Sequence, residues 1–182
     1  MDRQRTGKIR LTVFLGNPGP DYRLSRHNFG WLLAERLEER HSISWKQKFK
    51  GSVAEIRMGG SLMRLLRPEG YMNRSGESVQ ACSRFFRVDP ENILIVHDDI
   101  EMDFGRFAIK QGGGLAGHNG LRSIATQLGT REFYRLRLGV SRPDRGSVSD
   151  YVLKPFSRME IAELPGILDK AAQMLEDLPD YP

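Results

Sequence analysis

Short β-like runs alternate with amphipathic helical segments along the chain, and this alternation limits the possible folds more than any other feature of the sequence. Three segments carry apolar residues at helical spacing, beginning at Phe29, Val79 and Leu121. Between and around them, apolar and β-branched runs predict strands at 9–15, 52–58, 62–67, 93–96, 106–110 and 134–140.

The connections between these elements predict how the sheet is built. The "GSL" at 60–62 is short enough for a hairpin, whereas the other connections pass through helices. We therefore expect an α/β fold with a mixed, mostly parallel sheet and helices on both faces. The length of 182 residues fits one such domain over residues 1–182.

Composition excludes several classes of protein. Cys82 is the only cysteine, so neither an intramolecular disulfide nor a cysteine-based zinc site is possible. The N-terminus has no apolar core like that of a signal peptide, and no apolar run approaches the roughly 20 residues of a membrane span. We expect a soluble, cytoplasmic protein with no membrane partner.

The net charge of +5 is unevenly distributed. Residues 157–182 hold two basic and six acidic side chains, which gives −4 for the tail and +9 for the remainder. A basic body favours a polyanionic partner such as nucleic acid, although a solvated basic surface has the same composition.

Polar residues with possible chemical roles gather where predicted strands end, which is where open α/β sheets bind ligands. "LGNPGPDYRLSRHNFG" (15–30) brings Asn17 and His27 between a strand and a helix, and "RPEGYMNRSGESV" (67–79) does the same for Tyr71, Met72 and Asn73. Taken singly, these residues are also ordinary turn formers, helix caps or core residues.

Two further segments follow the same pattern. "ILIVHDDIEMDFG" (93–105) ends an apolar strand in His97, Asp98 and Asp99, and "KQGGGLAGHNGLRS" (110–123) is a glycine-rich loop with Asn119 near a helix start. The acidic cluster does not have the spacing of an EF-hand loop, and the glycine-rich loop lacks the P-loop ending. Cys82 lies on an apolar stripe, which indicates a packed thiol, and no G-x-S-x-G elbow occurs, so water is the expected nucleophile of any hydrolysis.

In order and rough spacing, "LGNPG", "SRHNFG", "YMNRSG", "VHDD", "GGGLAGHNGLRS", "RLRLGV" and "VSDYVLKPF" resemble the bacterial-type peptidyl-tRNA hydrolases over about residues 9–160. The resemblance implies a monomer that hydrolyses the ester between a peptide and the 3′ ribose of tRNA, recycling peptidyl-tRNA released prematurely from ribosomes, without metal or cofactor. By position it implies catalytic residues His27 and Asp98, substrate-binding residues Asn17, Tyr22, Tyr71, Met72, Asn73 and Asn119, and tRNA-binding residues Lys110 and Arg137.

These residue types suit ester hydrolysis on chemical grounds. A histidine with a pKa near 6.5 accepts a proton from water at neutral pH, and a carboxylate such as Asp98 holds the imidazole in the useful tautomer. Asparagine amides can bind a peptide backbone or stabilise an oxyanion. Either Asn17 or Asn119 suits the oxyanion role, and the sequence does not choose between them.

Some positions depart from the family pattern. Gly70 replaces a common threonine, Leu115 and Ala116 stand where histidine or a small polar residue and glycine are frequent, and Ser25 also replaces a threonine. Two other functions stay open at this point. One is a non-catalytic RNA-binding relative of the same fold, and the other is a metal-dependent phosphohydrolase built on His97, Asp98 and Asp99.

Overall fold

The computed structural model describes residues 9–178, and within them seven strands form one sheet in the order β2-β3-β4-β1-β5-β7-β6. The four central strands are parallel, and β3 and β6 run against the other five. The strands are β1 (Leu11–Phe14), β2 (Lys46–Lys48), β3 (Gly51–Met58), β4 (Ser61–Pro68), β5 (Ile93–Asp99), β6 (Phe107–Gln111) and β7 (Tyr134–Gly139).

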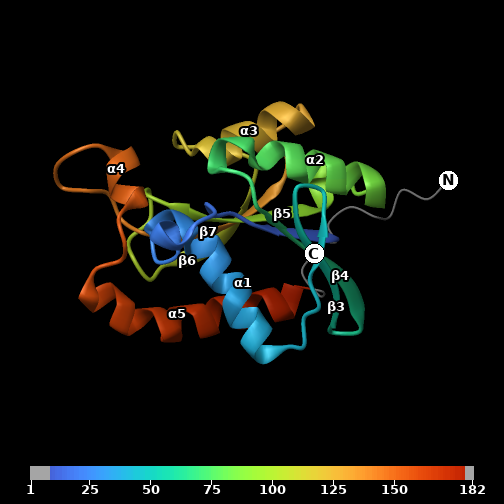
Figure 1. The fold of residues 1–182 in the computed structure, drawn as a ribbon, viewed down its shortest axis with the longest axis horizontal. Coiled ribbons are helices and arrows are strands. Elements are labelled where there is room, and N and C mark those ends of the chain that lie inside the picture. Colours follow the sequence, from blue (N-terminus) through green and yellow to red (C-terminus); the bar gives the residue numbers. More distant parts are fainter. Residues whose placement is uncertain (1–8, 179–182) are drawn as a thin grey trace.

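Helices cover both faces of this sheet, as Figure 1 shows. The apolar sides of α1 and α5 belong to one core cluster, and those of α2 and α3 belong to the other. The expected fold class is therefore confirmed. The α-helices are α1 (Phe29–Arg40), α2 (Ser75–Phe86), α3 (Asn119–Leu128), α4 (Val148–Leu153) and α5 (Arg158–Asp177).

All six predicted strands and all three predicted helices are present, with ends that move by at most four residues. The predicted hairpin joins β3 to β4 through Gly59 and Gly60, both of which have positive φ angles, as a tight hairpin turn requires. The sequence did not predict β2, α4 or α5. In α5, Leu164, Leu168 and Leu175 are buried at helical spacing, and Pro165 lies inside the helix on its exposed side.

The fold also places residues 157–178 of the acidic tail, and residues 179–182 lie outside the described part of the chain. Asp169 and Glu176 of α5 form ion pairs with Arg36 and Arg40 of α1, so these carboxylates help join the two helices. Among residues 9–178, none of the helices has the length and apolar character that crossing a membrane would take.

The parallel strands β1 and β5 are neighbours, and their carboxyl ends carry the segments that hold His27 and Asp98. Gly30, in the first turn of α1, packs so closely on these strands that a Cβ atom would lie 2.6 Å from the carbonyl oxygen of Leu15 and 2.7 Å from that of Val96. This glycine therefore allows the segment before α1 to reach the strand ends.

Candidate active site

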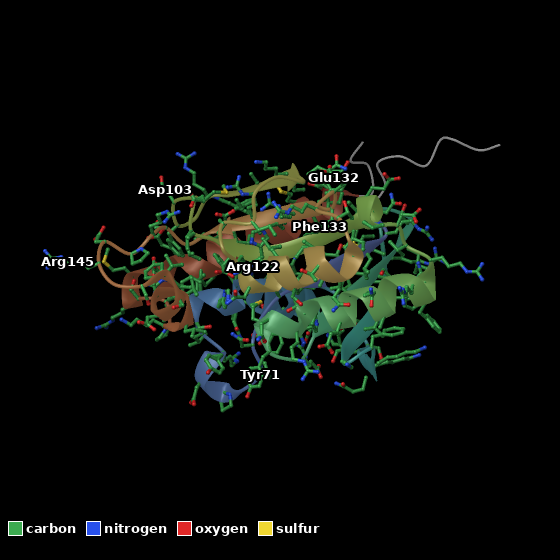
Figure 2. The ribbon with its side chains drawn as sticks, turned by 90° about the horizontal axis from the view of Figure 1, so that it is seen from above. Tyr71, Asp103, Arg122, Glu132, Phe133 and Arg145 are labelled. Atoms are coloured by element: carbon green, nitrogen blue, oxygen red, sulfur yellow. The ribbon has the colours of Figure 1, made fainter. Side chains whose placement is uncertain are left out.

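A cavity of about 450 Å³ opens at the carboxyl ends of β1 and β5. Both predicted catalytic residues, His27 and Asp98, line it, although 71 positions separate them in the sequence. All the predicted substrate-binding residues also line it, namely Asn17, Tyr22, Tyr71, Met72, Asn73 and Asn119. Tyr71 is 62% exposed and projects at the edge of the molecule in Figure 2.

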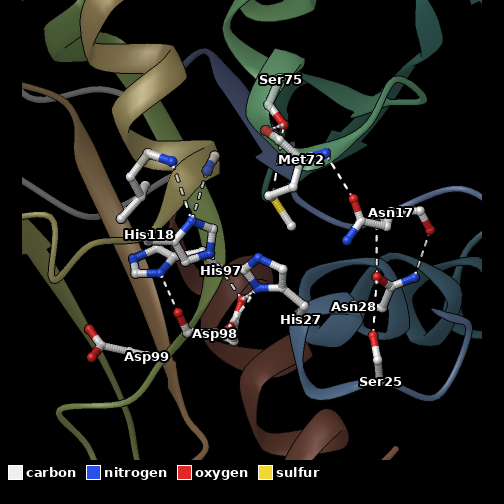
Figure 3. A network of polar contacts seen from close by, with 12 residues as sticks. Asn17, Ser25, His27, Asn28, Met72, Ser75, His97, Asp98, Asp99 and His118 are labelled. Carbon is white, nitrogen blue, oxygen red and sulfur yellow. Dashed lines mark hydrogen bonds and ion pairs between the residues drawn. The ribbon is translucent and has the colours of Figure 1, made fainter. Parts of the chain in front are cut away.

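Asp98 is the centre of a buried cluster that includes a second histidine (Figure 3). Nδ1 of His27 lies 2.9 and 3.0 Å from the two carboxylate oxygens of Asp98. Nε2 of His118 lies 3.0 Å from Oδ1 of Asp98, one of the two oxygens that His27 also contacts. The Asp98 side chain is only 2% exposed, so its charge depends on these two partners rather than on water.

The backbone fixes the tautomer of His118. His118 is the N-cap of α3, and its Nδ1 accepts hydrogen bonds from the amides of Gly120 (3.1 Å) and Leu121 (3.3 Å). Nδ1 therefore carries no proton, and the ring proton lies on Nε2, which donates to Asp98. Both nitrogens of His118 are thus in use. Within residues 9–178, by contrast, no protein atom is hydrogen-bonded to Nε2 of His27, whose ring lines the cavity.

The charges in this cluster shift the pKa values of its members. Burial alone would lower the pKa of His27, but the charge and hydrogen bond of Asp98 outweigh it and raise the pKa above 6.5. Burial likewise opposes ionisation of Asp98, yet His27 and His118 together lower the pKa of the carboxyl well below its usual range. Asp98 is therefore ionised at neutral pH, where it favours a protonated His27.

His97 is buried beside this cluster and has a different role. Burial, followed by the proximity of His118, lowers the pKa of His97 to about 3, so the ring is neutral at physiological pH. Its Nδ1 lies 2.7 Å from the carbonyl oxygen of Asp98, to which it donates. The side chain thus supports the backbone that presents Asp98.

One ring nitrogen of His27, a carboxylate oxygen of Asp98 and one ring nitrogen of His118 lie within 4.8 Å of one another, a spacing at which a metal ion could be held. Nδ1 of His27 and Nε2 of His118, however, already donate hydrogen bonds to the Asp98 carboxylate. To coordinate a metal through Nε2, His118 would have to lose its ring proton while Nδ1 still accepts two amide protons. The donor set thus fits a hydrogen-bonded cluster better than a metal centre.

The orientation of the Asn17 amide follows from its contacts. Oδ1 of Asn17 accepts from the backbone amide of Met72 at 2.8 Å, which leaves the Nδ2 group as the donor available to the cavity. Asn28 holds the backbone of Asn17 in place. Its Oδ1 accepts from the backbone amide of Asn17 at 2.8 Å, and its Nδ2 donates to the backbone carbonyl of Asn17 at 3.0 Å. Asn28 is therefore a support for Asn17 and not a side-chain cap of α1.

The two predicted tRNA-binding residues do not line the cavity. Lys110 is exposed on β6, opposite Arg135 of β7, and Arg137 lies two residues further along β7. Nε of Arg137 donates to Oδ2 of Asp99 at 2.6 Å, and Asp99 itself lines the cavity. Arg135 is buried and donates to the carbonyl of Gly112, so it supports the glycine-rich loop.

Sequence reasoning missed several residues of this site. His118 was present in the "GHNG" motif, and a histidine immediately before a helix start is a signal that could have been used. Four residues of α4 also line the cavity, and they belong to a helix that was not predicted: Val148, Ser149, Val152 and Leu153.

Comparison with known proteins shows the family to which the chain belongs. The sequence profile described as "Peptidyl-tRNA hydrolase" matches residues 11–180. Proteins named peptidyl-tRNA hydrolase from Geotalea daltonii and Bordetella avium are 43% and 45% identical to the chain. Each alignment covers 93% of the chain, with 90% and 85% of the respective relative.

A solved structure gives the same result. The crystal structure of peptidyl-tRNA hydrolase from Acinetobacter baumannii superimposes with a TM-score of 0.88 at 40% identity, covering 94% of this chain and 88% of that one. Fold and sequence thus agree, and the chain belongs to the peptidyl-tRNA hydrolase family of enzymes.

Proposed function

We propose that the cavity hydrolyses the ester of peptidyl-tRNA by attack of a water molecule that His27 deprotonates. The observation that carries this proposal is the difference between the two histidines on Asp98. His118 has both ring nitrogens engaged, whereas His27 keeps Nε2 for a water molecule or for substrate. His27 is thus the member of the pair able to accept a proton.

Asp98 orients His27 and favours the imidazolium that forms as the proton is taken. The carbonyl oxygen of the ester becomes an oxyanion during the attack, and the Nδ2 group of Asn17 is a suitable donor because its Oδ1 is already occupied. Proton return from His27 to the ribose oxygen completes the reaction without a covalent intermediate or a cofactor. Asn73, Asn119, Tyr22, Tyr71 and Met72 line the same cavity and contact the peptide and the terminal nucleoside.

The tRNA body extends from the cavity over the basic surface. Lys110 and Arg137 bind its phosphates, an assignment supported by the exposure of Lys110 and by the position of Arg137, whose partner Asp99 lines the cavity. Arg122 of α3 and Arg145 of the loop before α4 are further exposed cations (Figure 2). The enzyme acts as a monomer on peptidyl-tRNA released prematurely from ribosomes.

Replacing each histidine in turn tests the proposed mechanism. We expect His27→Ala to lose roughly 10²- to 10⁴-fold in single-turnover rate, because the water loses its proton acceptor. His118→Asn keeps an oxygen able to cap α3 and should lose much less, with the acidic limb of the pH–rate profile retained. A near wild-type rate for His27→Ala, together with a much slower His118→Asn, would reverse the two roles.

A further inference from the structure

Arg26, the residue before His27, is a buried cation with contacts that the reaction does not explain. The residue is 8% exposed, although arginine rarely lies inside a protein without a specific partner. Its Nη2 donates to Oε2 of Glu160, in α5, at 2.8 Å. Its Nη1 donates to the carbonyl oxygens of Tyr151 (3.3 Å) and Pro155 (3.2 Å). One guanidinium therefore joins α4, the segment after it and the start of α5.

The backbone makes a second connection at the same place. The amide of Arg26 donates to the carbonyl of Lys154 at 3.1 Å, and the amide of Phe156 donates to the carbonyl of Leu24 at 3.0 Å. Ser25 and Pro155 thus form an isolated antiparallel bridge. The guanidinium also stacks on Tyr151, with 4.1 Å between its carbon and the ring centroid.

These contacts act on the substrate cavity because α4 forms one of its walls. Val148, Val152 and Leu153 of α4 line the same cavity as His27. A buried arginine–glutamate pair is weak evidence for stability, since apolar replacements of similar volume are often neutral or stabilising. The planar guanidinium of Arg26 holds its donors in a fixed arrangement that lysine cannot reproduce, and this favours a role in positioning.

We propose that Arg26 is a positioning residue that holds α4 against the segment carrying His27 and so sets the width of the substrate cleft. The inference rests on the proposed function, because it takes this cavity to be the place where the peptide ester binds. Arg26 does not touch the reacting atoms. It acts through α4.

The first test compares Arg26→Lys with Arg23→Met. Arg23 is an exposed arginine three residues earlier that pairs with Glu35 and, within residues 9–178, forms no hydrogen bond or ion pair with α4, so it is the control. We expect Arg26→Lys to raise KM about tenfold with kcat within about threefold of wild type, because a loosened wall weakens ground-state and transition-state binding alike. The pH profile of kcat should be unchanged, and Arg23→Met should behave as wild type.

A disulfide can replace the lost connection. Ser25 and Pro155 form a non-hydrogen-bonded antiparallel pair, for which the Cα atoms lie about 4.5 Å apart and within disulfide range. We expect Ser25→Cys with Pro155→Cys, added to Arg26→Lys, to return KM to the wild-type value when the disulfide is oxidised. Reduction of the disulfide should raise KM again. Burial raises the pKa of Cys82 to about 12, so this native thiol takes no part.

Hydrogen exchange supplies a readout that does not depend on activity. Amides of residues 148–153 should exchange faster in Arg26→Lys, while those of β5 stay protected. Unchanged exchange and unchanged KM, or a loss of kcat that merely follows the folded fraction, would show that Arg26 serves only the fold. A wild-type protein that fails to cleave peptidyl-tRNA would instead reject the proposed function, and exchange would still test the connection to α4.

Discussion

The helix α1 has a histidine–carboxylate pair at each end, and the two pairs behave differently. Before its first turn, His27 lies 2.9 Å from Asp98, and after its last turn, His41 lies 2.8 Å from Glu176. The side chains of the first pair are 9% and 2% exposed, whereas those of the second are 31% and 16% exposed. The distances are alike, and what differs is the access of water.

The partners of each carboxylate add to this difference. Glu176 is shared with Arg40, and the hydrogen bond from Arg40 is the main reason why its pKa falls to about 2. Asp98 is shared with His118, whose two ring nitrogens are both engaged, so His27 is the partner that keeps a ring nitrogen free for a proton. Burial, and the absence among residues 9–178 of an arginine or lysine paired with Asp98, thus make the first pair suitable for proton transfer, while the second joins two helices.

The largest effect that distinguishes the two pairs is expected from neutralising each carboxylate. Asp98→Asn should slow hydrolysis roughly 10- to 100-fold, less than loss of His27, because the amide oxygen can still accept from both histidines. Without the negative charge, the pKa of His27 falls, so the acidic limb of the pH–rate profile moves to lower pH. Glu176→Gln should leave rate and profile unchanged, and a similar shift in both variants would remove the distinction.

A third ion pair, Arg137–Asp99, has intermediate burial and extends the comparison to tRNA binding. Arg137→Ala and Lys110→Ala should each raise KM about tenfold with little change in kcat. Each should also reduce the slope of log affinity against log salt concentration by about one, the effect of losing one phosphate contact. Arg57→Ala, on β3 near the opposite edge of the sheet, is the control. If the variants lose as much activity on a substrate without an acceptor stem as on full peptidyl-tRNA, both residues serve the reaction or the fold and not tRNA binding.

A smaller effect is expected in the loop that precedes His118. Ala116 has a φ angle of +49°, a conformation that glycine adopts without strain. Ala116→Gly should therefore stabilise the protein by roughly 0.5–1 kcal/mol, as measured by urea unfolding, with little change in KM. Destabilisation instead would mean that the alanine methyl group makes contacts worth more than the strain.

No effect is expected from removing metal ions. Hydrogen bonds occupy the ligand atoms of the buried cluster, so EDTA should leave cleavage of a substrate without the tRNA body at its original rate. That substrate avoids any influence of magnesium on tRNA folding. Inhibition by EDTA that added Mg²⁺ or Zn²⁺ reverses would revive a metal-dependent reaction.

The sequence predicted the central sheet well because its strands are buried on both sides and read as apolar runs. The exposed edge strand β2, with its sequence Lys46, Gln47 and Lys48, has no such pattern. The proximity of His27 and Asp98 came only from the family resemblance, since no local rule joins residues 71 positions apart. His118 was missed because its role depends on α3 beginning at Asn119 and on β5 placing Asp98 beneath it.

Because His118 both caps α3 and donates to Asp98, few other residue types can replace it. Any replacement must accept from the amides of α3 and donate to Asp98, from atoms on opposite sides of one short side chain. Serine, threonine and aspartate can cap the helix, but none of them presents a planar donor beyond the capping atom. Asparagine offers both groups but is shorter than an imidazole. We therefore expect relatives of this protein to carry histidine at this position, with asparagine as the one alternative that offers both groups.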